Sequence, residues 1–425
     1  MFLYDFHVHL HGVLSAHDLW LLGKDRFRQR TPALTWYASE YLKSWGRLPD
    51  FLSYWQSPGG EAALSYDFLI QEAVSFRQFQ ACFNLIIALL PISQHDFSAQ
   101  SLSIQRAAAA GLIYFEARSL IPASFSKGEA FSYLHNLASL VTQLNREQAM
   151  QTSLVFMLDR RAEFRDRHYR WLRDFCTAQP LLAQVISGID FAGWEEPFSP
   201  ESAQQFMEQA QRDNASGHYL DLLYHVGESF STIGLASSLR WIFTVQKMGV
   251  SRLGHALSLG FNPERLRGKT LWEDEEEYHS QQRWLRTQAS LLADYGYRPL
   301  AAQQRLGLRP GKVQLTYNDE VIEDICRLQA ALASYLRDQG TVIECCPTSN
   351  RYLGGIAGDA DHPLRFFVRH QLKVVLGSDD PGIFASSWAE QSAYATRLAS
   401  NHGCAATAQE LWHQRLTRGF GSGSA

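Results

Sequence analysis

The sequence is poor in cysteine and has no paired-cysteine motif. Six cysteines occur among 425 residues, none with CxxC spacing, and two of them are adjacent. Small secreted domains instead carry many regularly spaced cysteines, because disulfides replace part of their core. We therefore expect a reduced compartment and interpret all six as buried thiols: Cys82, Cys176, Cys326, Cys345, Cys346 and Cys404.

Long apolar runs and an excess of one charge are also missing. No uncharged run reaches the length that crosses a membrane, and the first residues, MFLYDFHVHL, lack the basic region of a signal peptide. The net charge is -4 at pH 7, which gives no general attraction for nucleic acid or for an anionic membrane. We therefore expect a cytoplasmic protein whose partner is a small molecule, with no membrane and no nucleic-acid polymer involved.

Internal repeats and low-complexity linkers are absent as well, so nothing in the sequence marks a domain boundary. Hydrophobic residues make up 46% of the chain and include 25 Phe and 11 Trp, which provide for a large core. Length alone leaves two arrangements open, one decorated barrel or two domains.

Short β-branched or aromatic runs alternate with longer amphipathic helical stretches, a pattern typical of βα units around a parallel sheet. The gaps after the first and the sixth run exceed a simple crossover and predict insertions. We predict an α/β fold, a single (β/α)8 TIM barrel over residues 1–425, with helical insertions at about 18–110 and 261–340. The apolar run from Cys82 to Leu90 is predicted to be buried helix. The eight predicted strands are Phe2 to Val8, Leu112 to Ala117, Ser153 to Leu158, Gln184 to Asp190, Tyr219 to Tyr224, Ser251 to Gly254, Thr341 to Cys345, and Lys373 to Leu376.

Polar residues with metal-binding chemistry follow several of these runs. In a (β/α)8 barrel the carboxyl ends of the strands share one face, so such residues converge even when they are distant in sequence. Each motif taken alone is weak, since a strand-end histidine is usually a structural residue. The residues are His7 and His9 at the end of the first run, His225 after the fifth, His255 after the sixth, and Asp379 and Asp380 after the eighth.

The HxH pair carries the most specific geometry. Side chains alternate along a strand, so His7 and His9 point to the same side and one metal can accept both. Together with His225 and Asp379 they form a set of three imidazoles and one carboxylate. This set suits Zn2+ with an open position for water.

Six segments resemble those of the adenosine deaminase family of amidohydrolases, in the same order: DFHVHLHG, FAGWEE, HVGE, RLGHA, CCPTSN and GSDDP. The resemblance extends from Asp5 to Phe384, and the combination of HxGE, CPTSN and SDDP is more specific than HxH. It implies that one Zn2+, or another divalent transition metal, is bound by His7, His9, His225 and Asp379.

The resemblance also implies catalytic and substrate-binding roles. Glu228 would protonate the ring nitrogen next to the attacked carbon, and His255 would orient and polarise the attacking water. Asp379 would be catalytic as well as a ligand. Asp380 would contact the purine near N7, and the backbone N–H of Gly193 would meet N3. Each role has a structural alternative. Glu228 could be an ordinary strand-end carboxylate and His255 a structural histidine. Asp380 could belong to a DDP turn, and Gly193 to a plain turn.

Other matched residues are expected to support the site. Glu116 and Arg118 lie on one side of the second strand and resemble a family pair. Residues Pro347 to Asn350 are expected to shape the pocket wall. Cys346 is interpreted as a buried thiol and not a nucleophile, because no separate base is assigned to it.

One position departs from the family pattern. Nucleoside-specific members usually have an acidic residue two positions after HxH, in contact with the ribose 5'-hydroxyl, and this chain has His11. We therefore expect His11 to bind the 5' side of the substrate, where it can donate hydrogen bonds to a phosphate and its charge depends on pH near neutrality. Arginines that suit phosphate oxygens follow the third run, although interleaved acids make a solvated helix the favoured interpretation. The basic residues concerned are Arg160, Arg161, Arg165 and Arg167, and, after the first run, Lys24, Arg26, Arg28 and Arg30.

These observations lead to one functional hypothesis and two rivals. The hypothesis is a hydrolytic deaminase of a purine nucleoside or nucleotide of the adenine type, in which activated water attacks C6 and ammonia is released. The first rival is an amidohydrolase that acts on another purine or on a free base. The second is a barrel whose main role is structural or regulatory assembly, with oligomerisation through the helical insertions.

Overall fold

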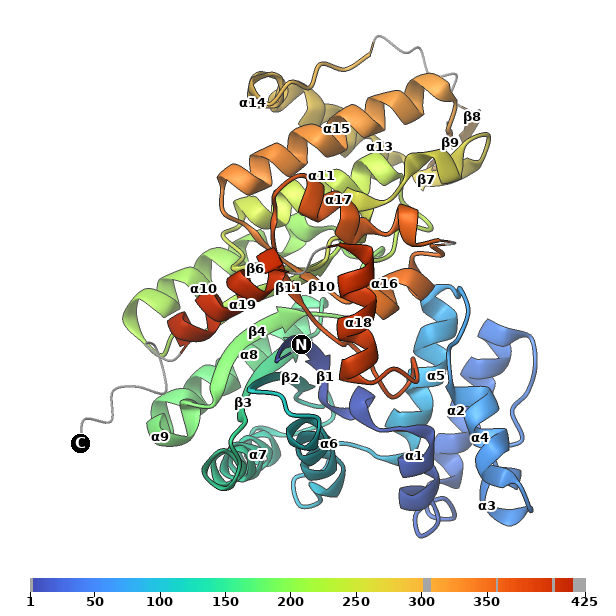
Figure 1. The fold of residues 1–425 in the computed structure, drawn as a ribbon, viewed down its shortest axis with the longest axis vertical. Coiled ribbons are helices and arrows are strands. Elements are labelled where there is room, and N and C mark those ends of the chain that lie inside the picture. Colours follow the sequence, from blue (N-terminus) through green and yellow to red (C-terminus); the bar gives the residue numbers. More distant parts are fainter. Residues whose placement is uncertain (1–2, 301–306, 357, 400–401, 416–425) are drawn as a thin grey trace.

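The barrel sheet has eight parallel strands in a computed structural model that describes residues 3–300, 307–356, 358–399 and 402–415 (Figure 1). All eight predicted runs correspond to strands of this sheet, although Phe2 lies outside the described residues. Their order is β1 (Tyr4–His9), β2 (Tyr114–Leu120), β3 (Gln151–Leu158), β4 (Ile186–Phe191), β5 (Asp221–Val226), β6 (Arg252–His255), β10 (Val342–Cys345) and β11 (Lys373–Leu376).

The sheet closes where the chain that leaves β11 meets β1. Val8 and Asp379 form a parallel bridge there. The N–H of His9 donates to the carbonyl of Asp379 at 2.8 Å, and the N–H of Asp379 donates to the carbonyl of His7 at 2.8 Å. Eight parallel strands with helices around them form a (β/α)8 barrel, so the predicted fold class is confirmed.

Helices surround the barrel and cover its outer face (Figure 1). Three short 3-10 helices, η1 (Leu10–Val13), η2 (Pro200–Ala203) and η4 (Asp359–Asp361), lie in the connections. The helices outside the two long insertions are α7 (Lys127–Glu147), α8 (Ala162–Ala178), α9 (Pro180–Ala183), α10 (Gln204–Ser216), α11 (Leu235–Lys247), α12 (Leu257–Gly260), α16 (Pro347–Leu353), α17 (Pro363–Arg369), α18 (Trp388–Leu398) and α19 (His402–Arg415).

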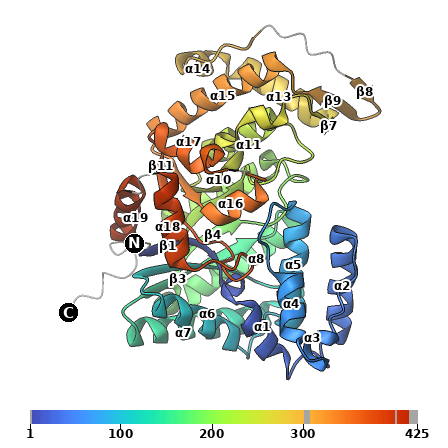
Figure 2. The same cartoon turned by 45° about the vertical axis from the view of Figure 1, so that its right-hand side comes forward.

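The first long insertion is helical and stands beside the barrel, where Figure 2 shows α2, α4 and α5 as neighbours. The predicted buried helix is confirmed as part of α5, which begins at a capping box formed by Ser75 and Gln78. Its buried face packs into a hydrophobic cluster of its own. The helices are α1 (Ala16–Gly23), α2 (Thr31–Trp45), α3 (Ser53–Gln56), α4 (Gly60–Phe68), α5 (Phe76–Leu89) and α6 (Ser98–Ala109).

The second insertion contains an antiparallel sheet in addition to helices, which the sequence did not predict. Its strands pair in the order β7 (Thr270–Asp274), β9 (Lys312–Thr316), β8 (Gly307–Arg309). The strands are short and carry charged residues, so the strand pattern is weak in the sequence. The remaining elements are η3 (Pro263–Leu266), α13 (Glu275–Thr287), α14 (Ala289–Asp294) and α15 (Asp319–Asp338).

The cysteines are all free, as predicted, but one is not buried. Cys326 is exposed, because α15 is amphipathic and this position lies on its outer face. The other five are buried thiols. Among the residues that the structure describes, no helix combines the length and apolar character needed to span a membrane.

Helix α19 packs against the amino-terminal end of the barrel. The ring of Trp412 lies 4.8 Å from that of Tyr114 on β2, between ring centroids. Arg415 reaches into the barrel floor, where its guanidinium group contacts Asp221 at 2.8 Å and Glu116 at 3.3 Å. All three of these charged side chains are buried. The last described helix therefore supplies a cation to the interior of the barrel.

We expect the substitution Arg415→Met to lower the free energy of unfolding by about 3 kcal/mol, because Glu116 and Asp221 would stay buried with one cation fewer. The midpoint of urea denaturation measures the loss. Arg397→Met is the matched control, since Arg397 is 60% exposed in its pair with Asp359, and this substitution should leave the denaturation midpoint nearly unchanged. Equal stability of the two variants would contradict a structural role for the buried cation.

Candidate active site

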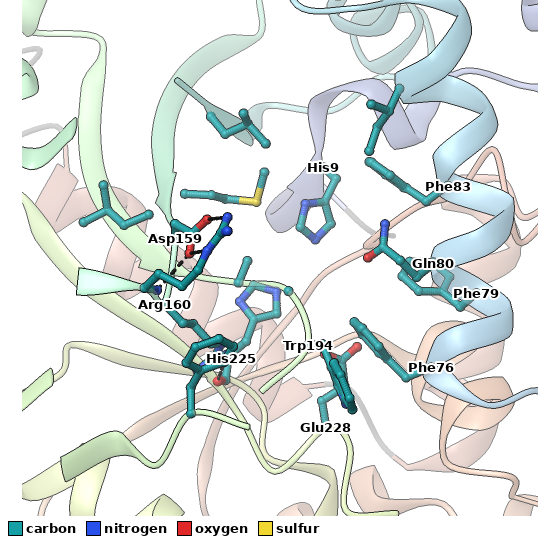
Figure 3. A pocket seen from close by; sticks show the side chains of 18 of the residues that line it. His9, Phe76, Phe79, Gln80, Phe83, Asp159, Arg160, Trp194, His225 and Glu228 are labelled. Atoms are coloured by element: carbon teal, nitrogen blue, oxygen red, sulfur yellow. Dashed lines mark hydrogen bonds and ion pairs between the residues drawn. The ribbon is translucent and has the colours of Figure 1, made fainter. Parts of the chain in front are cut away.

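A cavity of about 620 Å³ opens at the carboxyl ends of the barrel strands (Figure 3). His9, His225 and Glu228 line one end of it, together with Asp379 and Asp380. Helix α5 forms one side wall through Phe76, Phe79, Gln80, Phe83 and Ile87, with the Phe83 ring 6.2 Å from that of His9 between centroids, and the ends of β2, β3 and β4 complete the cavity.

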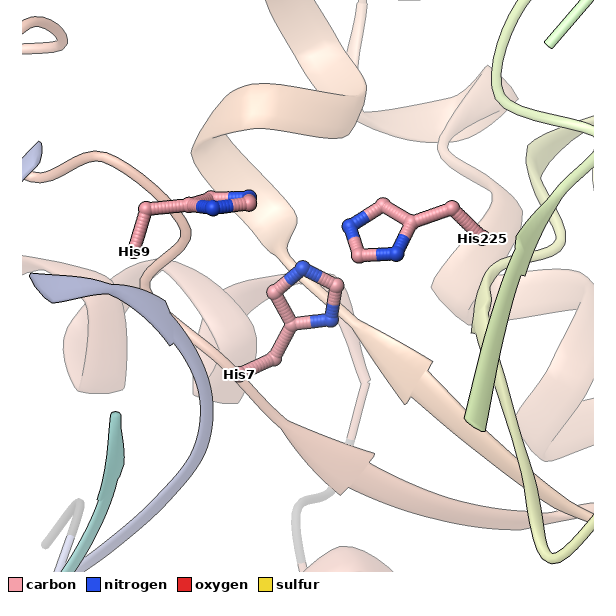
Figure 4. A group of neighbouring side chains, drawn as sticks. All are labelled: His7, His9 and His225. Carbon is pink, nitrogen blue, oxygen red and sulfur yellow. The ribbon is translucent and has the colours of Figure 1, made fainter. Parts of the chain in front are cut away.

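Three imidazoles converge at the polar end, as Figure 4 shows for His7, His9 and His225. The ring centroid of His7 lies 4.5 Å from that of His225 and 5.8 Å from that of His9. One nitrogen from each ring lies within 4.8 Å of the others. The structure therefore brings together the three histidines that the sequence predicted as metal ligands.

Asp379 completes this group from the other side of the barrel seam. Its Oδ1 lies 3.3 Å from His9 Nε2 and 3.6 Å from His7 Nε2. Its Oδ2 and the Nε2 atoms of His7 and His225 are buried, and none has a hydrogen-bond partner among the described residues. Asp379 also has a φ of 61°, a left-handed conformation that non-glycine residues adopt at a cost of order 1–3 kcal/mol, often at functional sites.

The converging atoms fit a divalent metal ion. Imidazole nitrogens and a carboxylate oxygen are ordinary ligands for such ions. Buried polar atoms normally have partners, so several acceptors around one point that have none among the described residues fit a bound cation. We conclude that the donor set accommodates a divalent metal.

Carboxylates behind the histidines fix their orientation. Nδ1 of His7 lies 2.7 Å from Glu344 Oε2, and Nδ1 of His225 lies 3.1 Å from Asp190 Oδ1. A proton on Nδ1 that is held by a carboxylate leaves Nε2 with a free lone pair, as metal ligation requires. Arg118 Nε in turn donates to Asp190 at 2.6 Å, and its Nη2 contacts Glu344.

Glu344 and Asp190 were not predicted as site residues. A signal was present in the sequence, because each is an acid inside an otherwise apolar strand, in VIECC and GIDF. Such residues are rarely buried without a partner. Burial raises the pKa of Glu344 to about 7 despite its arginine neighbours. Burial acts in the same direction on Asp190, but His225 and Arg118 outweigh it and hold its pKa well below the usual range.

Glu116 and Arg118, which were predicted to support the site together, contact different groups. Arg118 holds the carboxylates behind the histidines, whereas Glu116 pairs with Arg252 and Arg415. Arg252 Nε also lies 2.7 Å from Glu344 Oε1. Buried charges therefore form a continuous series from α19, through the barrel floor, to the carboxylate behind His7.

Glu228 follows β5 in a loop that a second glutamate holds. The backbone N–H groups of Gly227, Glu228 and Ser229 donate to the Glu195 carboxylate at 2.7 to 2.9 Å. Glu195 belongs to the FAGWEE segment, in which sequence analysis assigned a role only to Gly193. Burial raises the pKa of Glu228 and raises that of Glu195 to about 7.

His255 faces Glu228 across the site. Its Nε2 lies 3.5 Å from Glu228 Oε1, and its Nδ1 lies 3.3 Å from Asn350 Oδ1. Burial lowers the pKa of His255, but Glu228 and Asp379 together outweigh this effect and the net direction is upward. Asn350, from the CCPTSN segment, thus contacts a candidate catalytic residue. The sequence analysis expected Pro347 to Asn350 only to shape the pocket wall.

Gly193 and Asp380, two of the predicted substrate-binding residues, both line the cavity. Gly193 lines the cavity with a φ of 81°, a conformation that favours glycine. Asp380 lines it too, and both of its carboxylate oxygens are buried with no partner among the described residues. Burial and the neighbouring Asp379 raise the pKa of Asp380 well above its usual range. Cys346 is a buried thiol whose pKa burial raises strongly, as expected for a residue that is not a nucleophile.

His11 is not among the residues that line the cavity. It lies buried on η1, and burial lowers its pKa to about 4, so its ring is neutral near pH 7. The predicted attraction of a charged His11 for a 5'-phosphate is therefore not supported near pH 7.

The arginines after β3 are largely committed to protein acceptors. Arg160 donates through Nη2 to the carbonyls of Phe191 and His225, at 3.1 and 2.8 Å. Arg161 pairs with Asp159. Arg165 donates to Asp166, and Arg167 to the carbonyl of Ala123. Of these four, only Arg160 and Arg161 line the cavity, and none of Lys24, Arg26, Arg28 and Arg30 does.

A second cavity of about 610 Å³ adjoins the first. Both are lined by Phe76, Trp194 and Glu228, so these side chains lie between them. Its other walls come from the start of α5, the loop after β5, the second insertion and the end of α16, and they include the exposed cations Arg77 and Lys269.

Comparisons by sequence match short segments. The adenosine deaminase family model matches residues 316–411. An aminodeoxyfutalosine deaminase from Acidothermus cellulolyticus is 37% identical over 68 residues, which are 16% of this chain and 19% of that protein. An adenine deaminase from Sinorhizobium fredii is 37% identical over 84 residues, which are 20% of this chain and 24% of that protein. The matched segments thus span less than two thirds of either relative.

Comparisons by structure extend over nearly the whole chain. An adenine deaminase from Arthrobacter aurescens has a TM-score of 0.54 at 17% identity and covers 97% of this chain and 98% of its own. An amidohydrolase from Burkholderia ambifaria with bound Zn has a TM-score of 0.53 at 15% identity, and the match covers 98% of this chain and 92% of that protein. Arabidopsis ADAL in complex with IMP has a TM-score of 0.55 at 14% identity, and the match covers 98% of this chain and 96% of that protein.

Fold and donor set together define a (β/α)8 barrel with a histidine-rich candidate metal site at its carboxyl face. Residues 316–411 are similar to the adenosine deaminase family, and the solved structures share the fold over nearly the whole chain.

We expect the purified protein to contain about one divalent transition metal ion per chain, and His9→Ala to lose most of it, because one of four ligands is removed. Elemental analysis by mass spectrometry measures both. His17→Ala is the matched control, since His17 is 55% exposed and pairs with Glu61 away from the site. Full metal content in His9→Ala would contradict the ligand assignment.

Proposed function

We propose that this protein is a metal-dependent aminohydrolase that removes the exocyclic amino group of an adenine compound. The observation that carries the proposal is the convergence of partnerless atoms of His7, His225 and Asp379, beside Glu228 and His255. The family model and the relatives described as adenine deaminases support the same chemistry.

We further propose that the metal is zinc, held by His7, His9, His225 and Asp379. Three imidazoles and one carboxylate with an open position are typical of catalytic zinc, and one structural neighbour holds zinc. When bound, the ion supplies a water molecule whose pKa is lowered toward neutrality.

In the proposed reaction, Glu228 and His255 transfer the protons. Glu228 would give a proton to the ring nitrogen next to the carbon that carries the amino group. His255 would orient and polarise the attacking water and take one of its protons as the bond from the water oxygen to that carbon forms. The carbon–nitrogen bond then breaks, and the amine leaves as ammonia with the proton from His255. The second water proton restores Glu228. The sum is an adenine compound and water giving a 6-oxo purine and ammonia.

Asp380 and Gly193 would orient the ring. Both line the cavity, and the oxygens of Asp380 have no protein partner among the described residues. We propose that Asp380 binds the ring near N7 and that the backbone N–H of Gly193 binds N3. These contacts would place the amino-bearing carbon at the end of the cavity where His225 and Glu228 lie.

The two rival functions are action on another purine or a free base, and a structural role in assembly, and they predict different experimental results. Relatives described as adenine deaminases favour a free base, whereas the neighbour that holds IMP favours a nucleotide. A role in assembly through the insertions would give a defined oligomer in light scattering with no turnover. The complete set of catalytic groups favours an enzyme over that role.

A substrate panel tests the proposal. We expect the zinc-loaded protein to release ammonia from at least one of adenine, adenosine and AMP, and to yield the corresponding 6-oxo purine by mass spectrometry. The pyrimidine cytidine serves as control and should not react, because it lacks the imidazole ring that Asp380 would bind. Absence of ammonia from every adenine compound would refute the proposed function.

We expect Glu228→Gln to lower kcat by about 100-fold or more while leaving the metal content unchanged, because the amide keeps the shape but cannot deliver the same proton. Steady-state kinetics and elemental analysis are measured on the same preparation. Glu163→Gln, an exposed position on α8, is the control. Near-wild-type turnover would exclude the proton-donor role, and loss of metal would make Glu228 a ligand instead.

A further inference from the structure

We propose that the preferred substrate carries an aryl-bearing substituent on C2 of its adenine ring, and that this C2 arm occupies the second cavity. The inference rests on the proposed function and concerns the side of the site where Glu228 lies. It is carried by the side chains that separate the two cavities, by the part of the purine that faces them and by the chemistry of the walls beyond.

Only side chains separate the second cavity from the first at this point. Phe76, Trp194 and Glu228 line both cavities, and Figure 3 shows Trp194 next to the other two. Trp194 is 38% exposed, so its ring has room to turn toward solvent. A Cβ placed on the neighbouring Gly193 would meet no atom within 4 Å, so the wall beside this residue is open. The second cavity is therefore within reach of a ligand bound in the first.

The position of the purine next to these side chains is C2. In the proposed reaction Glu228 protonates N1, the ring nitrogen beside the amino-bearing carbon, and the N–H of Gly193 binds N3. C2 is the carbon between these two nitrogens, so it lies between Glu228 and Gly193, on the side of Trp194. Substituents on C8 or N9 leave from the five-membered ring, on the other side of the molecule from N1. C2 is therefore the carbon from which a substituent enters the second cavity.

The walls of the second cavity present mainly aromatic and aliphatic surface. Three of its hydroxyl groups already donate to the carboxylate of Glu196, and they belong to Ser229, Ser231 and Thr232. Apolar walls bind apolar groups, and aromatic rings pack against one another in stacked or edge-on arrangements. An aryl group therefore suits these walls better than a polar one. The aromatic and aliphatic lining residues include Trp194, Phe230, Phe261, Leu266, Leu271 and Tyr317.

The size of the second cavity and the contacts of Arg77 agree with an aryl group. The volume of about 610 Å³ falls in the range of roughly 300–1,000 Å³ that small-molecule sites occupy, so a phenyl-sized group fits. The guanidinium carbon of Arg77 lies 5.3 Å from the centroid of the Trp194 ring, a cation–π contact. A planar guanidinium group stacks on aromatic faces, so Arg77 can contact the ring of the C2 arm in the same way.

The test compares adenine, adenosine and AMP, each with and without a 2-phenylamino group, on the zinc-loaded protein. In the series that reacts best, we expect kcat/KM of the phenylamino compound to exceed that of its parent by about tenfold or more, because the ring is buried. The 2-methylamino compound is the control, since it has the same nitrogen on C2 but no ring. If no adenine compound reacts, the proposed function is wrong and this inference falls with it. If the parents react but the phenylamino group gives no more than the methylamino group, only the inference is overturned.

A variant of the second cavity tests where the C2 arm lies. Thr270 is an exposed residue of β7 that lines this cavity, so Thr270→Trp places a large ring there. This variant should lower the ratio of kcat/KM for the phenylamino compound to that for its parent by about fivefold or more. Thr35→Trp is the matched control, since Thr35 is exposed on α2 and lines neither cavity. An unchanged ratio in Thr270→Trp, with normal metal content and melting temperature, would overturn the assignment of the second cavity to the C2 arm.

Discussion

The candidate site depends on the contacts of one buried guanidinium group, that of Arg118. It contacts the carboxylates of Asp190 and Glu344, and each of these holds the Nδ1 side of a histidine. Its Nη1 also donates to the carbonyl of Phe6 on β1, at 2.9 Å. One side chain therefore ties together β1, β2, β4 and β10. Charges this deeply buried are costly to desolvate, and a folded barrel retains them only because each finds a partner.

The barrel was predictable from the sequence because its signals are local. A strand in a parallel sheet is a short run of β-branched and aromatic residues, and a helical crossover carries its own 3.6-residue pattern. The residues at the strand ends then follow from the architecture, which is why the sequence alone allows His7, His9, His225 and Asp379 to be grouped. The sheet of β7, β8 and β9 could not be predicted in this way, because its short, charged strands are stabilised by pairing between distant segments.

The supporting residues of the site were missed for a related reason. The functions of Glu344, Asp190 and Glu195 lie in contacts with residues 32 to 337 positions away, and no local pattern encodes such pairs. The arginines after β3 are a different case, because the sequence already favoured a solvated helix over a phosphate site. Their number and spacing suited a phosphate, but the structure engages Arg160 with backbone carbonyls and Arg161 with Asp159. Charge in a sequence indicates a ligand only when the fold leaves that charge without a protein partner.

The seam of the barrel has a consequence for how the protein matures. The main chain of Asp379 is hydrogen-bonded to that of His7 and His9, so the two ends of the sheet meet at the candidate metal ligands. A ribosome produces the chain from its amino terminus at about 5–20 residues per second. More than three hundred residues are therefore made between His9 and Asp379. The full set of candidate ligands exists only once Asp379 has been made, and a nascent chain that exposes its HxH pair holds only half of that set.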